Sequence, residues 1–259
     1  MNKKYAEYES MYEYANEELI HLKNRYAKQG LPVNYINYYN RLRCTYSKIG
    51  FGKLLIEGKV EECKKNFYKS AYMTKIINEK LEGALYDENW AYGFWNQIDQ
   101  LYFAILSDSY SLVIELIKLI GNIKEQEIKV NDQKFVYYVM YFYKNYILNN
   151  MDAAKESLKE LRKTTEEDIA DFCLLLPDIF EALLCSDDKK LSDMLNVFCS
   201  ESIKSSIYVD TFQEVVCIEG LAIAKLAIIS GLNIKLDKSV VGTELLEKVD
   251  IDYPNIDIV

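Results

Sequence analysis

The stretch AILSDSYSLVIELIKLI, residues 104–120, contains the pattern that decides the fold. Two aliphatic residues, Ile105 and Leu106, precede the polar corner Ser107-Asp108-Ser109, and apolar residues then recur at helical spacing. Ser and Asp are preferred just before a helix, because their side-chain oxygens accept hydrogen bonds from free backbone N–H groups. The stretch therefore predicts one helix, a tight corner and a second, amphipathic helix.

The same pattern occurs three more times, with corners near Gly58, Asn150 and Asp187. The successive aliphatic pairs begin 50, 42 and 36 residues apart, which is too irregular for a strict repeat. Apolar and aromatic stripes over 5–26 and 35–49 predict two further helices before the first corner. We expect an all-α fold of stacked antiparallel αα-hairpins, a degenerate TPR- or HEAT-like right-handed helical array.

The domain organisation follows from the lack of an internal linker rich in Pro or Ser. Residues 1–231 are expected to form a single helical domain, with its last long helix running from Thr211 to Ile229. Residues 232–259 are expected to form a short irregular tail, packed on the domain or extending from it.

A second capping prediction places the start of a helix near Gln133, with Asp132 as its N-cap.

Composition excludes several classes of function. With 31 Lys and Arg against 40 Asp and Glu, the formal charge of −9 argues against a uniformly basic nucleic-acid binder. The first residues contain no apolar core of a signal peptide, and no run is long enough to span a membrane. The six cysteines form no C-x-x-C pair, so we expect buried, reduced thiols in a cytoplasmic protein.

Catalytic and cofactor motifs are weak. His21 is the only histidine, so Glu18 and His21 lack the second E-x-x-H that a di-iron bundle needs. Gly50-Phe51-Gly52-Lys53 lacks the spacing of a phosphate-binding loop and is expected to form a helix corner or kink. We expect no bound metal and no cofactor.

Three carboxylates and the tyrosines leave alternatives open. Asp178 and Glu181 follow Pro177 and form either a buried pair or the first turn of a restarted helix. Glu219 lies in an apolar stretch, where its expected partner is Lys225 or a neighbouring helix. The 22 tyrosines, of which several crowd residues 137–146, suit core packing or a protein interface, as do the aromatic residues at 90–95.

Three segments resemble a known family. The first two are Leu54 to Cys63, and Phe180 to Leu184 before Asp187-Asp188. The third, IEGLAIAKLAIISGL at 218–232, is similar to the terminal helix of the immunity protein 49 family of polymorphic toxin systems. The resemblance implies an all-helical bacterial antitoxin that binds and neutralises a cognate secreted toxin, and it implies no catalytic residues.

The leading functional hypothesis is therefore an immunity protein, not an enzyme, that acts by stoichiometric protein–protein interaction. Its partner would be a cognate toxin domain, for which a basic nuclease is one option, without direct contact to nucleic acid or membrane. A TPR-like scaffold or peptide-sensing regulator is the alternative, and a helical enzyme using Glu219, or Asp178 with Glu181, is a third. Candidate partner-binding residues are the densest acidic groups: Glu166, Glu167, Asp168, Asp187, Asp188, Asp250, Asp252 and Asp257.

Overall fold

The computed structural model describes residues 3–32, 35–80, 93–120, 131–164 and 170–253. These residues form α-helices and short 3-10 helices and contain no strand, so the predicted all-α class is confirmed. The helices are α1 (Lys3–Gln29), α2 (Tyr35–Leu55), α3 (Val60–Lys80), α4 (Gly93–Leu106), α5 (Tyr110–Ile120), α6 (Asn131–Ile147), α7 (Met151–Leu161), α8 (Leu176–Leu184), α9 (Asp188–Ser202) and α10 (Ile218–Ile229).

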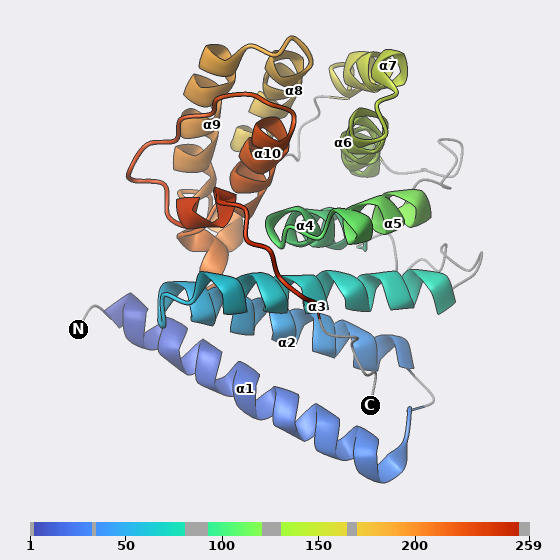
Figure 1. The fold of residues 1–259 in the computed structure, drawn as a ribbon, viewed down its shortest axis with the longest axis vertical. Helices are drawn as coiled ribbons and strands as arrows, with labels where there is room; N and C mark the ends of the chain where they lie inside the picture. The colour runs from blue at the N-terminus through green and yellow to red at the C-terminus, as the bar shows by residue number, and fades with distance from the viewer. Residues whose placement is uncertain (1–2, 33–34, 81–92, 121–130, 165–169, 254–259) are drawn as a thin grey trace.

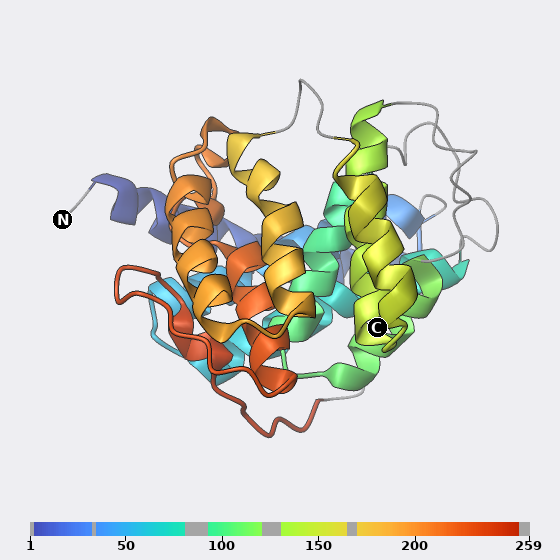
Figure 2. The same ribbon diagram turned by 90° about the horizontal axis from the view of Figure 1, so that it is seen from above.

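Successive helices pack side by side as hairpins, as Figure 1 shows. α1 covers α2, α2 packs on α3, and α3 contacts both α4 and α5, while α6 pairs with α7 and α8 with α9. α10 departs from this order, because it packs between α9 and α4 instead of ending the array. Seen from above in Figure 2, the tail runs along the outside of α9 and α10, and its last described residue, Tyr253, stacks on Tyr68 of α3.

The predicted corners are confirmed, and they share one backbone geometry. Gly58, Asp108, Asn149 and Ser186 all have left-handed φ values, of 64°, 65°, 61° and 54°. This conformation favours Gly and is tolerated best by Asn and Asp among the other residues. At Asn149 and Ser186 the following backbone N–H donates to a carbonyl five residues earlier, at 2.7 and 3.0 Å, which closes the end of the preceding helix.

Three local predictions were wrong. The last helix begins at Ile218, not Thr211, because Thr211 Oγ1 accepts from Gln213 N–H at 3.2 Å and closes a separate 3-10 turn at Phe212–Glu214. Helix α6 begins at Asn131, so Asp132 lies within it and does not precede it. Of the corner or kink expected at Gly50 to Lys53, the corner is excluded, because the segment lies inside α2.

The glycines of α2 serve close packing on both sides of the helix. A Cβ at Gly52 would lie 2.1 Å from the Tyr12 ring of α1, and one at Gly50 would lie 2.6 Å from the Phe67 ring of α3. Such distances are far inside van der Waals contact, so α2 can approach both neighbours only with glycine at these positions. The same two residues that weaken the helix in isolation therefore allow three helices to pack.

The core is continuous through α3, α4, α6, α8, α9 and α10. Residues Ile218 to Ala227 of α10 are all buried, which explains why the helix is apolar on every side. Tyr137, Tyr138 and Tyr143 of the Tyr-rich helix are buried, as the core-packing alternative predicted, and so is Tyr102 of α4. Among the described residues, no helix is both long and apolar enough to cross a membrane.

Candidate functional site

Two lysines and one aspartate form a buried ionic cluster between α3, α10 and the α4–α5 corner. The side chains of Lys64 and Lys225 are 0% and 2% exposed, and that of Asp108 is 5% exposed. Lys225 Nζ lies 2.6 Å from Asp108 Oδ1, and Lys64 Nζ contacts Asp108 Oδ2. Burial lowers the pKa of Lys225 to about 8, an effect that Asp108 opposes and the charge of Lys64 reinforces.

This cluster holds the C-terminal tail. Lys225 Nζ donates to the carbonyls of Leu245, Leu246 and Glu247 at 3.1, 2.9 and 3.0 Å, and Lys64 Nζ also donates to Glu247. In return, Asp108 Oδ2 accepts from Val249 N–H at 3.1 Å. The carbonyl dipoles offset the one positive charge that a single carboxylate leaves unbalanced. We call Lys64, Asp108 and Lys225 the tail clamp.

The first part of the tail is fixed along one face of α9. Asp188 accepts from Asn233 N–H at 3.2 Å, Ser192 from Lys235 N–H at 3.0 Å, and Asn196 from Asp237 N–H at 2.8 Å. Residues four apart lie on the same face of a helix, so these three side chains form a straight ladder. Further along, the Tyr253 ring stacks on Tyr68 with centroids 4.1 Å apart. The tail is therefore packed on the domain throughout its described length.

A pocket of about 440 Å³ opens beside the tail clamp, and we call it the tail pocket. Asp108 and Lys225 of the clamp line it, and Leu246 and Lys248 contribute a wall from the tail. Two large side chains at its rim face solvent: Tyr110 is 50% exposed and Ile229 is 54% exposed. The remaining lining residues come from α4, α5 and α10 and are Ile105, Val113, Leu226 and Ile228.

The structure separates the acidic residues predicted to bind a partner. Asp187 caps α9 by accepting from Lys190 N–H at 3.0 Å, and Asp188 holds the tail, so both have structural partners. Asp250 and Asp252 are exposed on the tail, and Asp250 lies 3.5 Å from Lys248 at the tail pocket. Glu166, Glu167, Asp168 and Asp257 lie outside the described residues, as does the aromatic segment at 90–92.

The candidate catalytic carboxylates have different surroundings from one another. The buried-pair alternative for Asp178 and Glu181 was wrong: Asp178 is exposed in the first turn of α8, and Arg162 binds both carboxylates at 3.0 and 3.1 Å. Glu219 is buried and accepts from the Tyr102 hydroxyl on α4, so its partner is a neighbouring helix and not Lys225. Burial raises the pKa of Glu219 to about 7.

The histidine and the six cysteines differ in exposure. His21 is exposed on α1. Cys63, Cys173, Cys199 and Cys217 are buried, whereas Cys44 and Cys185 are exposed, so burial was predicted correctly for four of the six thiols. Within the described ranges there is no group of three or more His, Cys, Asp or Glu side chains arranged to hold a metal ion.

The tail clamp was missed by sequence reasoning, although one signal was visible. Lys225 interrupts the apolar run from Leu221 to Ile229, and a lysine buried in such a helix requires an acidic partner. Asp108 was assigned as a helix cap. In the structure Asp108 instead balances the charge of buried lysines. This role depends on Lys64, which is 44 residues away, and on tail carbonyls more than 130 residues away that bind the same lysines.

No protein-family model, curated protein or solved structure matches the chain. The resemblance to the immunity protein 49 family therefore remains a prediction from the sequence.

Proposed function

We propose that this chain is an immunity protein of a bacterial polymorphic toxin system, which binds a cognate toxin domain in the cytoplasm and neutralises it stoichiometrically. The observation that carries the proposal is the tail pocket, an apolar hollow rimmed by the exposed Tyr110 and Ile229. Interfaces concentrate binding energy in aromatic and apolar anchors near pockets. Because the tail clamp fixes one wall of the pocket, little conformational entropy is lost on binding.

Charge supports a basic partner, of which a nuclease toxin domain is the leading example. The chain carries a net charge of −9, and the exposed Asp250 and Asp252 follow the tail wall of the pocket. An acidic surface beside an apolar anchor site accelerates association with a basic protein and excludes acidic ones. The protein then has no need to contact nucleic acid itself.

A TPR-like scaffold or peptide-sensing regulator is the second candidate, and the same pocket supports it. A volume of about 440 Å³ is within the range of sites that enclose small ligands, so it would accommodate the end of a peptide. In that case binding would be retained by a short peptide, whereas an immunity interface requires the folded toxin domain.

The experiment is co-expression with the product of the adjacent reading frame, tested as the candidate toxin, followed by growth and co-purification measurements. Tyr110→Ala with Ile229→Ser should abolish growth protection and reduce affinity at least about tenfold, since each anchor contributes 1 kcal/mol or more. Tyr14→Ala with Ile20→Ser is the matched control, because both residues are 61% exposed but lie on α1. Equal loss in both double variants would contradict the assignment of the pocket, and no effect of the toxin on growth or binding would contradict the function.

A further inference from the structure

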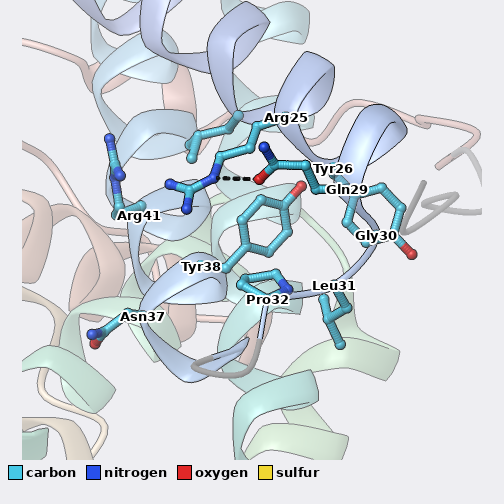
Figure 3. Close-up of a pocket in the computed structure, with 10 residues that line it drawn as sticks. Arg25, Tyr26, Gln29, Gly30, Leu31, Pro32, Asn37, Tyr38 and Arg41 are labelled. Carbon is cyan, nitrogen blue, oxygen red and sulfur yellow. Dashed lines mark hydrogen bonds between the residues drawn. The ribbon is translucent and has the colours of Figure 1, made fainter.

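A second pocket, of about 460 Å³, lies between the end of α1 and the beginning of α2, far from the tail pocket in sequence. Figure 3 shows Arg25 from α1 and Arg41 from α2 on one side of it and the Tyr38 ring at its middle, with Pro32 and Leu31 beyond. We call it the hairpin pocket. The other lining residues are Leu22, Tyr26, Gln29, Gly30 and Asn37.

The segment that forms the hairpin pocket has a charge opposite to that of the whole chain, and the Glu18 carboxylate at its edge binds Arg41. Residues 19–56 contain seven Lys and Arg and no Asp or Glu, in a protein whose net charge is −9. Three of the four arginines of the chain, Arg25, Arg41 and Arg43, lie in this segment. A local excess of arginine at a concave surface is the pattern by which proteins bind phosphate and carboxylate groups.

The two pocket arginines keep donors for a ligand. Arg41 uses Nε, at 2.9 Å, and one terminal nitrogen on the same oxygen of Glu18, which orients its guanidinium. Arg25 donates from Nε to the neutral Gln29 side chain at 3.3 Å. A guanidinium has five N–H donors, so both groups retain unused ones, and the Glu18 carboxylate binds Arg41 through one of its oxygens.

The floor of the pocket is aromatic and apolar. Leu22 is 1% and Tyr38 8% exposed, and Tyr26 stacks on Tyr38 with centroids 5.7 Å apart and ring planes 24° apart. Tyr38 and Asn37 belong to the first turn of α2, where the helix dipole also favours an anion. A cationic rim over an aromatic floor matches a phosphate group attached to a planar ring.

We propose that the hairpin pocket binds a phosphorylated small molecule with an aromatic ring, of the mononucleotide class. Arg25 and Arg41 hold the phosphate, while Tyr38 and the apolar residues contact the ring. The pocket volume is within the range of small-ligand sites. The hairpin pocket shares no lining residue with the tail pocket. If the hairpin pocket binds no ligand, the proposed function is therefore unaffected.

The test is calorimetric titration of the full chain with AMP, adenosine and inorganic phosphate. AMP should bind more tightly than phosphate and more weakly as salt rises, and adenosine should not bind measurably. Arg25→Gln should weaken AMP binding about ten- to a hundredfold, as expected for a lost charge-assisted hydrogen bond. Arg25→Lys should restore part of the affinity, because it returns the charge without the planar fork.

The matched control is Arg162→Gln, which removes the remaining arginine from an exposed site on the α7–α8 side. This variant should bind AMP with unchanged affinity. Circular dichroism should show that both glutamine variants keep the helical fold. Absence of AMP binding at about 1 mM, equal binding of adenosine, or equal affinity in Arg25→Gln and the wild type would each overturn the proposal.

Discussion

The tail clamp and the hairpin pocket use basic side chains in opposite ways. Lys64 and Lys225 are buried, and one carboxylate with four carbonyl contacts occupies their donors. Arg25 and Arg41 are exposed at a concavity, in a segment without acidic residues. The buried lysines therefore stabilise the fold, whereas the exposed arginines retain N–H donors that a ligand could use.

Burial decides what the charged side chains do in these two regions. Removing water makes an unpaired charge expensive, so every buried charge must be matched within the protein. An exposed charge is solvated, so it can keep free donors until a ligand arrives, as Arg41 does although Glu18 binds part of its guanidinium. Substitutions in the two regions should therefore affect different observables, stability in one and binding in the other.

The largest effect is expected at the centre of the clamp. Asp108→Asn removes the only carboxylate that the two buried lysines share, so the free energy of unfolding should fall by about 3–5 kcal/mol. Urea denaturation followed by circular dichroism measures it. Asp210→Asn is the matched control, because Asp210 has a similar left-handed φ, 61° against 65°, but is exposed. A loss at Asp108 no larger than that at Asp210 would show that the clamp adds no stability.

A second buried charge, Glu219, predicts a pH dependence. Its pKa is 4.5 in the unfolded chain and about 7 in the fold, so the folded protein holds this proton more tightly. Its contribution to stability is therefore greatest below about pH 4.5 and falls as the pH rises to about 7. Glu219→Gln should remove that fall and stabilise the protein at pH 8, by up to roughly 3 kcal/mol.

The measurement is the difference in unfolding free energy between Glu219→Gln and wild type, taken from pH 4 to pH 8. Asp99, whose pKa burial also raises to about 7, is present in both proteins, but its charge helps to raise the pKa of Glu219, so the difference includes the interaction between the two carboxylates. A curve for Glu219→Gln that is parallel to wild type would contradict the raised pKa.

A smaller effect is expected where the tail follows α9. Ser192→Ala removes the acceptor of Lys235 N–H and should lower the unfolding free energy by about 1 kcal/mol. Hydrogen exchange at Lys235 should accelerate at the same time. Ser47→Ala is the control, since the Ser47 hydroxyl donates to Cys44 within its own helix, and it should leave the tail unchanged. Unchanged exchange at Lys235 in Ser192→Ala would argue against the ladder.

The smallest effect on stability is expected at the exposed acids of the tail. Asp250→Lys with Asp252→Lys should change the unfolding free energy by less than about 0.5 kcal/mol, because surface charges contribute little. If the tail faces a basic toxin, the double variant should associate with it more slowly than wild type at low salt. This difference in association rate should fade as salt rises. Unchanged association at low salt would remove the acidic tail from the binding surface.

The sequence predicted the helices and corners well, because those depend on local periodicity and on capping residues. The corners near Gly58, Asp108, Asn150 and Asp187 were all located this way. The candidate site was predicted poorly, because it depends on contacts between distant segments. Nothing near Asp108 indicates that a lysine on α3 and another on α10 converge on it, and Arg25 and Arg41 meet only when α1 folds back on α2.

The tail clamp also bears on how the protein is made. Lys64 donates a hydrogen bond to the backbone carbonyl of Glu247, a residue that the ribosome adds 183 residues later. Domains generally fold as the chain emerges, from the N-terminus onward. Until residues 245–249 emerge, the nascent chain must therefore keep α3 and α10 apart or leave two ammonium groups hydrated between them. Final compaction waits until residues 245–249 have emerged, and a nascent chain stalled before residue 245 leaves the facing surfaces of α3 and α10 without these contacts.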